Sequence, residues 1–334
     1  MELTKLSNLG QKEKDLVKEQ FAMDVLTGLY SKPKSISAKY FYDDLGSQIF
    51  QDITKHDDYY PTKIEFEILD KIKSIIPTLI DSKEIDIIEL GAGDGHKSHL
   101  LIKGFLDQNI SVNFYPIDIS EKAMILLEEN ITSHPKLKIH GVVSEYMQGL
   151  QFLRRKSSNK KLVLFLGSNI GNFDRIQSQV FLRRLWQNLD DSDHILIGFD
   201  LKKNVDTLLT AYNDSAGHTK KFNLNLLARI NNELGGNFDL TQFDHFGTYN
   251  PSLGAMESYL LSNTEQKVYI SKLERSFQFH KMEPIHLEYS FKFLKRDVDY
   301  LSEQTGFKVI EHFTDPKDYF LDSLWEVKKE TSKN

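Results

Sequence analysis

A short apolar run followed by a glycine-rich turn constrains the fold of this chain more than any other segment. Residues 86–90 have the length and composition of a buried strand. Three glycines follow directly, Gly91, Gly93 and Gly95. Glycine at a strand-to-helix turn lets the backbone approach a bulky ligand closely. Because residues 97–106 then show helical spacing, we predict an α/β fold with a nucleotide-type cofactor at this turn.

The middle of the chain alternates strand-like and helix-like segments. Expected strands are 86–90, 112–117, 137–143, 161–166 and 194–199, and expected helices are 97–106, 121–130 and 177–189. Such alternation favours parallel βαβ units in a doubly wound sheet.

The pattern changes after residue 200. Two expected helices, 205–212 and 222–234, precede four strand-like runs without intervening helices, at 256–261, 266–270, 277–280 and 286–293. This arrangement predicts a mixed α+β insert. A helix at 297–304 and a strand at 307–313, which rejoins the sheet, are expected to complete the fold.

Composition narrows the class of function. The net charge of -6, with both signs mixed, provides no overall positive field for nucleic acid. The chain has no cysteine, which excludes disulfides, thiol catalysis and thiolate metal sites. No run reaches the ~18 apolar residues of a membrane span, and the first 19 residues lack the apolar core of a signal peptide. Residues up to about 18 are expected to form a solvated leader or helix. We therefore expect a cytoplasmic protein with no nucleic-acid, membrane or metal partner, and leave its oligomeric state open, a monomer being compatible.

Acidic residues flank the glycine turn. Glu89 precedes it, and Asp118 ends the next expected strand, where a carboxylate can accept both hydroxyls of a ribose. The spacing departs from the G-x-G-x-x-G of pyrophosphate binders, because Gly95 comes one place early. S-adenosylmethionine has no pyrophosphate, so the departure favours this methyl donor. A tight turn that holds no ligand is the alternative.

A second loop is expected to face the same ligand. Residues 167–173, Gly-Ser-Asn-Ile-Gly-Asn-Phe, follow the apolar strand at 161–166. Ligands of open α/β sheets lie beyond the carboxyl ends of the strands. The glycines give backbone freedom and the asparagines give neutral hydrogen-bonding groups, although a simple Asn- and Gly-rich turn has the same composition.

Specific motifs recur along most of the chain. They are residues 39–43, 59–62, 89–93, 167–172, 211–217 and 288–290. Together they resemble the L-histidine Nα-methyltransferases of the ergothioneine pathway, over roughly residues 31–327. The resemblance implies a Rossmann-like class I methyltransferase sheet with an inserted α+β substrate-binding domain. It assigns residues 61–200 and 288–334 to the S-adenosylmethionine-binding domain, and residues 1–60 and 201–287 to the substrate-binding domain.

The same resemblance implies a role for individual residues. The cofactor-binding set is Tyr42, Phe50, Gly91, Gly93, Lys97, Asp118, Glu145 and Tyr146. Glu145, which would meet the adenine, stands where the family commonly has aspartate. The substrate-binding set is Tyr59, Gly167, Asn172, Tyr212, Ser258, Glu288 and Ser290, in which the two tyrosines and the asparagine hold the amino and carboxylate groups. The implied catalytic set is Tyr42, Tyr59, Tyr212 and Asn172.

Two residues of the 286–293 strand suit an imidazole on chemical grounds as well. Glu288 and Ser290 are two apart, so they project from the same face. A carboxylate can accept a ring N–H and a hydroxyl can serve the other nitrogen. The polar outer face of an edge strand would show the same pattern. Where the family often has methionine beside the imidazole, the resemblance places Ser258, with Met256 only two residues away as the alternative register. A smaller polar residue there could widen the pocket or admit water.

The expected reaction is methylation of the α-amino group of L-histidine, three times, to the betaine hercynine. An N-methyltransferase of another amino acid or aromatic amine is the first alternative. A non-catalytic protein that binds the cofactor is the second.

Overall fold

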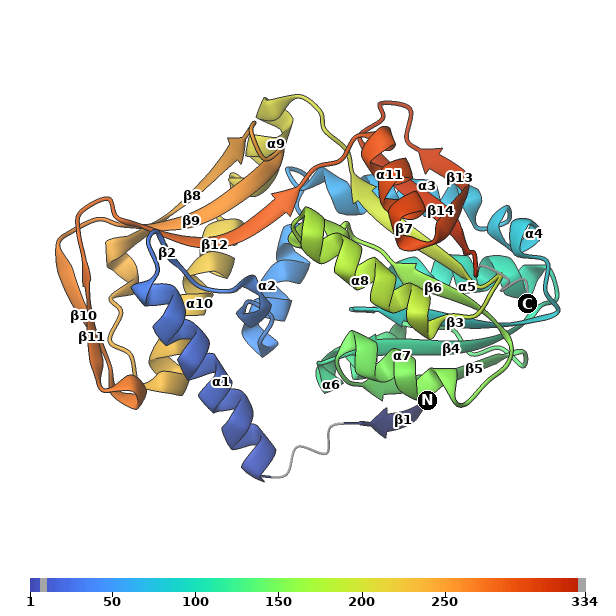
Figure 1. The fold of residues 1–334 in the computed structure, drawn as a ribbon, viewed down its shortest axis with the longest axis horizontal. Helices are drawn as coiled ribbons and strands as arrows, with labels where there is room; N and C mark the ends of the chain where they lie inside the picture. The colour runs from blue at the N-terminus through green and yellow to red at the C-terminus, as the bar shows by residue number, and fades with distance from the viewer. Residues whose placement is uncertain (7–10, 330–334) are drawn as a thin grey trace. The chain divides into compact units, whose positions relative to one another are not determined.

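The computed structural model describes residues 1–6 and 11–329, and its contacts divide into two compact units (Figure 1). Unit 1 contains the described residues of 1–8, 61–202 and 292–334. Unit 2 contains those of 9–60 and 203–291.

Unit 1 is built on an eight-stranded sheet in the order β1-β5-β4-β3-β6-β7-β14-β13. The strands are β1 (Glu2–Lys5), β3 (Glu84–Leu90), β4 (Ser111–Asp118), β5 (Leu137–Val143), β6 (Lys160–Phe165), β7 (His194–Asp200), β13 (Phe307–Thr314) and β14 (Phe320–Val327). The first six in sheet order pair in parallel, and β14 runs antiparallel to both of its neighbours. The α/β class with a mainly parallel sheet is therefore confirmed.

Helices lie on both faces of this sheet (Figure 1). They are α3 (Tyr60–Ile72), α4 (Ile76–Ile80), α5 (His96–Asp107), α6 (Glu121–Asn130), α7 (Tyr146–Arg154), α8 (Arg175–Asn188) and α11 (Lys295–Thr305). The central strands β3, β6 and β7 are almost entirely buried, which explains their continuous apolar runs. The core beneath the glycine turn is formed by branched and aromatic side chains, among them Ile87, Phe105, Phe114 and Leu164.

Two strands of this sheet were not expected. The expectation of a solvated leader or helix at the N-terminus is wrong for Glu2–Lys5. These residues form β1, which pairs with residues 140–143 of β5. Its exposed, polar character is that of a short edge strand. β14 was missed because the buried polar pair Asp322 and Ser323 interrupts its apolar run.

The compact units also differ from the expected segments at three places. The middle segment of unit 1 ends at Lys202, two residues beyond the expected boundary at 200. β1 lies in the sheet of unit 1, whereas the expected substrate-binding segment began at residue 1. Unit 2 continues to Phe291, four residues beyond the expected boundary at 287. Residues 7–10 and 330–334 of the expected segments lie outside the described residues.

Unit 2 has a four-stranded sheet in the order β2-β12-β9-β8 and a two-stranded β10–β11 sheet. Its strands are β2 (Lys34–Ser35), β8 (Phe243–Asn250), β9 (Ala255–Ser262), β10 (Gln266–Ile270), β11 (Arg275–Phe279) and β12 (Pro284–Phe291). Its helices are α1 (Gln11–Tyr30), α2 (Asp44–Lys55), α9 (Val205–Tyr212) and α10 (His218–Leu234). The expected α+β insert is present, and β8 is a strand that the sequence did not predict.

One buried cluster holds unit 2 together. Phe21 of α1, Phe222 of α10 and Phe243 of β8 are each at most 4% exposed and belong to it. Asp43 caps α2 by accepting from the Gly46 N–H, and it also accepts from Asn225 of α10. Within the described ranges, no helix is both long and apolar enough to span a membrane.

Candidate functional site

The glycine turn after β3 is closed on one side and open on the other. Gly91 and Gly93 have φ values of 74° and 55°, which side chains disfavour. A Cβ on Gly91 would lie 2.7 Å from the phenol oxygen of Tyr146, whereas a Cβ on Gly93 would meet no described atom within 4 Å. The backbone at Gly93 is therefore accessible to a ligand, and Tyr146 lies beside the turn.

Asp118 lies at the end of β4, directly beside this turn. Its carboxylate accepts from the Ser120 N–H at 2.9 Å and, at 3.5 Å, from the Gly93 N–H. Burial raises the pKa of Asp118, and these backbone donors oppose the shift. A carboxylate beside an open glycine turn can accept the ribose hydroxyls of S-adenosylmethionine. This cofactor has no phosphate group that would need an arginine or lysine.

Glu145 and Tyr146 begin α7 next to the turn. Glu145 is the exposed N-cap residue, so its carboxylate is accessible. Tyr146 makes edge contacts with Phe165 and Phe181, at centroid distances of 6.1 and 6.5 Å, and burial raises its pKa. The two residues thus provide a polar acceptor and an aromatic wall, which suits an adenine ring.

Glu89, the acidic residue that precedes the turn, is buried. It is 4% exposed, and its Oε2 has no hydrogen-bond partner in the part of the chain that the structure describes. Burial raises the pKa of Glu89 to about 8. Its carboxyl group is therefore mainly protonated at neutral pH and is packed beneath the turn.

Lys97 and Gly167 share a partner that the sequence did not predict. Glu65 of α3 is fully buried, pairs with the Lys97 ammonium, and accepts from the Gly167 N–H at 2.7 Å. One carboxylate thus connects a predicted cofactor residue to a predicted substrate residue within unit 1. Nothing in the local sequence pattern of α3 marks this glutamate.

The loop after β6 is fixed at its start and accessible at its end. Gly167 and Ser168 both have positive φ, 76° and 56°. Ser168 Oγ accepts from the Asp200 N–H at 3.0 Å, which ties the loop to the end of β7. Asn172 ends a short 3₁₀ helix, 169–172, and is exposed. Its amide is therefore available to a ligand.

Four of the predicted aromatic residues form a row of ring contacts in unit 2. Tyr42 contacts Phe50, Phe50 contacts Tyr59, and Tyr59 contacts Tyr212, at centroid distances of 5.5, 6.3 and 6.4 Å. All three contacts are edge-on, the geometry that aromatic pairs prefer. The structure thus brings these four residues together.

The strand pairing settles where Ser258 lies. Ser258 of β9 is directly opposite Glu288 of β12, and Met256 is opposite Ser290. Opposed residues share a face of the sheet, so all four project from the same side. Ser258 and Ser290 are buried, Glu288 is half-buried, and Ser290 Oγ accepts from the Tyr212 phenol at 2.6 Å. The predicted imidazole residues therefore form one polar cluster.

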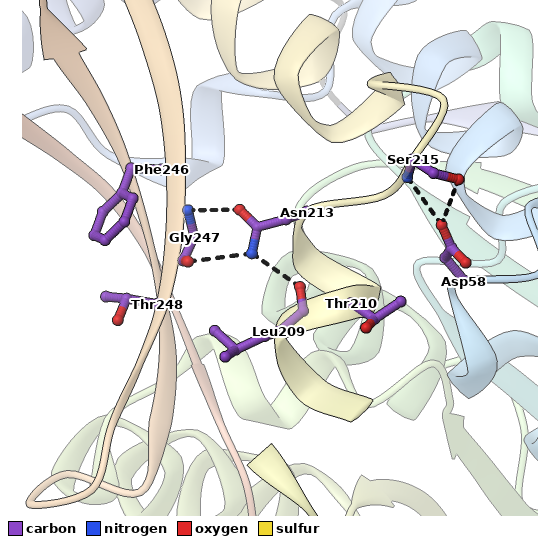
Figure 2. A pocket seen from close by; sticks show the side chains of 8 residues that line it. All are labelled: Asp58, Leu209, Thr210, Asn213, Ser215, Phe246, Gly247 and Thr248. Carbon is purple, nitrogen blue, oxygen red and sulfur yellow. Dashed lines mark hydrogen bonds between the residues drawn. The ribbon is translucent and has the colours of Figure 1, made fainter. Parts of the chain in front are cut away.

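An open pocket of about 670 Å³ lies in unit 2, between the end of α9 and β8 (Figure 2). Its lining residues are Asp58, Leu209, Thr210, Asn213, Ser215, Phe246, Gly247 and Thr248. Asp58 accepts from the N–H and hydroxyl of Ser215, both at 2.9 Å, and the Asn213 side chain bonds both backbone groups of Gly247. The pocket contains none of the predicted substrate residues, but these bonds fix the segments that carry Tyr59 and Tyr212.

Comparison with known proteins identifies the family that this chain resembles along most of its length. A model of histidine-specific, S-adenosylmethionine-dependent methyltransferases matches residues 21–327. The histidine N-alpha-methyltransferase of Mycolicibacterium smegmatis is 33% identical over 93% of this chain and 96% of its own length. Ergothioneine biosynthesis protein 1 of Schizosaccharomyces pombe is 29% identical over 93% of this chain but 40% of its own length. The L-tryptophan methyltransferase of Psilocybe serbica is 25% identical over 84% of this chain and 86% of its own length.

The family match spans both units, and the open glycine turn with Asp118 in unit 1 fits the cofactor that the family uses. On these grounds the chain belongs to the S-adenosylmethionine-dependent, histidine-specific methyltransferases.

Proposed function

We propose that this methyltransferase acts on the α-amino nitrogen of L-histidine and adds three methyl groups, which gives the trimethylated betaine. The observation that carries the proposal is the polar cluster in which Glu288 lies opposite Ser258, and Ser290 is bonded to Tyr212. A carboxylate and a hydroxyl on one strand face match the two nitrogens of an imidazole.

The cofactor is proposed to lie against the glycine turn of unit 1. The backbone at Gly91 and Gly93 would approach the cofactor's amino-acid portion, and Asp118 would accept the ribose hydroxyls. Glu145 and Tyr146 would meet the adenine. The remaining residues of the proposed cofactor set are Lys97, Tyr42 and Phe50.

The substrate is proposed to be held at both of its ends. Glu288 would accept an imidazole N–H in a charge-assisted hydrogen bond, and Ser290 would serve the second ring nitrogen. Tyr59, Tyr212 and Asn172 would orient the amino and carboxylate groups, together with the Gly167 loop. These contacts would fix the direction in which the amine points.

The proposed mechanism is in-line displacement by a neutral amine. When bound, the cofactor would supply an electrophilic methyl group on its sulfonium; as the N–CH3 bond forms, the S–CH3 bond would break and its electron pair would return to sulfur, with S-adenosylhomocysteine as the leaving group. The α-ammonium must first lose a proton, and an ordinary tyrosine pKa of ~10 makes a phenol a poor resting base at neutral pH. We therefore assign the proton to water and assign Tyr59 and Tyr212 to orientation in a near-attack geometry. Aromatic faces stabilise a growing quaternary ammonium by ~0.5–2 kcal/mol per contact, which suits successive methylation.

A second candidate substrate is a larger aromatic amino acid. Ser258 is a small residue, buried directly opposite Glu288. A small side chain at this position favours a larger aromatic substrate, and one relative is named as a tryptophan methyltransferase. Pocket volume beside Glu288 is thus the property that separates the two candidates.

A panel of substrates tests the proposal. The enzyme is incubated with S-adenosylmethionine and each free amino acid in turn, and the methylated products are quantified by mass spectrometry. We expect L-histidine to be turned over with the highest kcat/KM. A higher kcat/KM for tryptophan would favour the second candidate, and turnover of neither would contradict both.

The proposed location is the cytoplasm, where S-adenosylmethionine and free amino acids are both found. A chain without cysteine suits a reducing compartment. Fractionation of the native organism, with this protein followed by antibody, tests the location.

A further inference from the structure

We propose that Glu65 is a positioning residue that sets Lys97 and the Gly167 loop in place with a single buried carboxylate. The assignment of Gly167 to the substrate rests on the function proposed above, whereas the cofactor side does not. Glu65 therefore acts through its two partners and needs no contact with either ligand.

The geometry divides the carboxylate between two segments. Oε1 accepts from the Gly167 N–H at 2.7 Å, and Oε2 pairs with the Lys97 ammonium. Gly167 follows β6 and Lys97 follows β3, and these strands are neighbours in the parallel sheet. Glu65 thus joins the carboxyl ends of two adjacent strands, where ligands of such sheets bind.

The sheet has a space shaped for this carboxylate. A Cβ on Gly198 of β7 would lie 2.3 Å from Glu65 Oε1, so a larger residue there would displace the carboxylate. Glu65 itself is 0% exposed. Because a buried charge is costly unless it is paired, Lys97 is held firmly at this position.

The nearby Asp322 leaves the charge balance of the pair intact. Asp322 of β14 lies opposite Gly198 and is 0% exposed, and neither carboxylate oxygen has a described hydrogen-bond partner. Burial and the Glu65 charge raise the pKa of Asp322 well above its usual value. The raised pKa favours the uncharged form of Asp322, which adds no second negative charge beside the Glu65–Lys97 pair.

The two functions of Glu65 can be separated by substitution. Glu65→Gln keeps a carbonyl acceptor for Gly167 but removes the charge that holds Lys97. Glu65→Leu removes both. Lys97→Met removes the ammonium and leaves the acceptor for Gly167. Asp322→Asn is the matched control, because Asp322 is a buried carboxyl opposite Gly198 that makes no described hydrogen bond to Glu65 or Lys97.

The test measures the Kd of S-adenosylhomocysteine by calorimetry for the four variants and for the double variant Glu65→Gln/Lys97→Met. We expect Glu65→Gln to weaken binding about 10-fold. We expect the double variant to bind no more weakly than Lys97→Met, because residues that act through one interaction are not additive. Asp322→Asn should bind like the parent. Additive losses in the double variant, or an unchanged Kd in Glu65→Gln with only a lower Tm, would overturn the proposal.

Substrate kinetics give the second measurement. The KM for histidine should change little in Glu65→Gln and rise at least about 5-fold in Glu65→Leu, since only the latter loses the Gly167 acceptor. An equal KM in the two variants would overturn the Gly167 part. If Glu65→Gln fails to fold, Glu65→Asp replaces it, and an unchanged Kd in that variant contradicts the proposal. Failure of the proposed function is seen separately, as no histidine turnover by the parent enzyme.

Discussion

The phenol of Tyr212 donates a hydrogen bond to Ser290 Oγ at 2.6 Å. This bond joins the end of α9 to β12, and its two residues are 78 positions apart in the chain. Since Ser290 accepts here, its own proton can be donated elsewhere. The bond therefore fixes the hydroxyl at the imidazole end of the proposed substrate site.

Tyr212→Phe tests the value of that bond. The substitution removes one hydroxyl and keeps the ring that contacts Tyr59. We expect the KM for histidine to rise about 10-fold, the scale of one buried hydrogen bond. Steady-state kinetics at saturating cofactor measure it, and the Kd of S-adenosylhomocysteine should stay constant. An unchanged KM would show that the hydroxyl does not contribute to substrate binding.

Glu288→Gln tests the carboxylate at the imidazole end. Loss of the charged acceptor should raise the KM for histidine about 10- to 100-fold, because hydrogen bonds to charged groups contribute ~1.5–3 kcal/mol. Cofactor affinity should be unaffected. Glu257→Gln is the control, since Glu257 is opposite Tyr289 in the register and so lies on the other face of the sheet, where its carboxylate accepts from Tyr259 and Asn250. Parent-like histidine kinetics in Glu288→Gln would refute the imidazole assignment.

Asp118→Asn tests the cofactor side. An amide can donate but cannot provide two anionic acceptors for the ribose hydroxyls, so cofactor affinity should fall about 10-fold or more. Calorimetry with S-adenosylhomocysteine measures the loss. Asp107→Asn, at the exposed far end of α5, provides the control. If the two variants bind equally well, Asp118 has no role with the ribose.

Glu89→Gln tests the buried carboxyl beneath the glycine turn. The folded protein holds this proton up to a pKa of about 8, whereas the unfolded chain loses it near the ordinary value of 4.5. The folded state therefore binds more protons between these pH values, and Glu89 lowers stability as pH rises through that window. The glutamine variant should have a higher Tm than the parent at pH 8 and a smaller advantage at pH 5. Thermal unfolding at both pH values checks this, and the opposite trend would contradict a protonated Glu89.

Ser258→Met tests the specificity of the pocket. Methionine is larger than serine and would lie opposite Glu288 at this register position. We expect the ratio of kcat/KM for histidine over tryptophan to rise about 10-fold, the usual effect of changing pocket volume by a few methylenes. Competition between the two amino acids in one reaction measures the ratio directly. A ratio that falls would place Ser258 away from the bound ring.

Most of unit 1 could be predicted because its central strands are buried on both faces and therefore appear as apolar runs. β14 could not, since Asp322 and Ser323 are polar but buried, and a polar pair is typical of a loop. β1 could not either, because a short exposed edge strand has no apolar signature. The strand register that places Ser258 opposite Glu288 could not be predicted from the sequence either, since strand pairing depends on residues that are distant in the chain.

The site residues could be predicted because they lie in motifs that resemble the family. The residues that hold them in place lie outside those motifs and could not be predicted. Glu65 lies on an amphipathic helix, where an acidic residue is usually solvated. Its partners Lys97 and Gly167 are 32 and 102 residues away, so only the folded structure brings them together. Asp58 and Ser215 are a similar case, 157 residues apart and joined by two hydrogen bonds.

The position and number of the methyl groups on the product test the central claim most directly. The enzyme is supplied with L-histidine and S-adenosylmethionine labelled with ¹³C at the methyl group, and the product is examined by NMR. We expect three equivalent labelled methyl groups, each correlated with the α-carbon. Label on a ring nitrogen, or no labelled histidine at all, would contradict the claim.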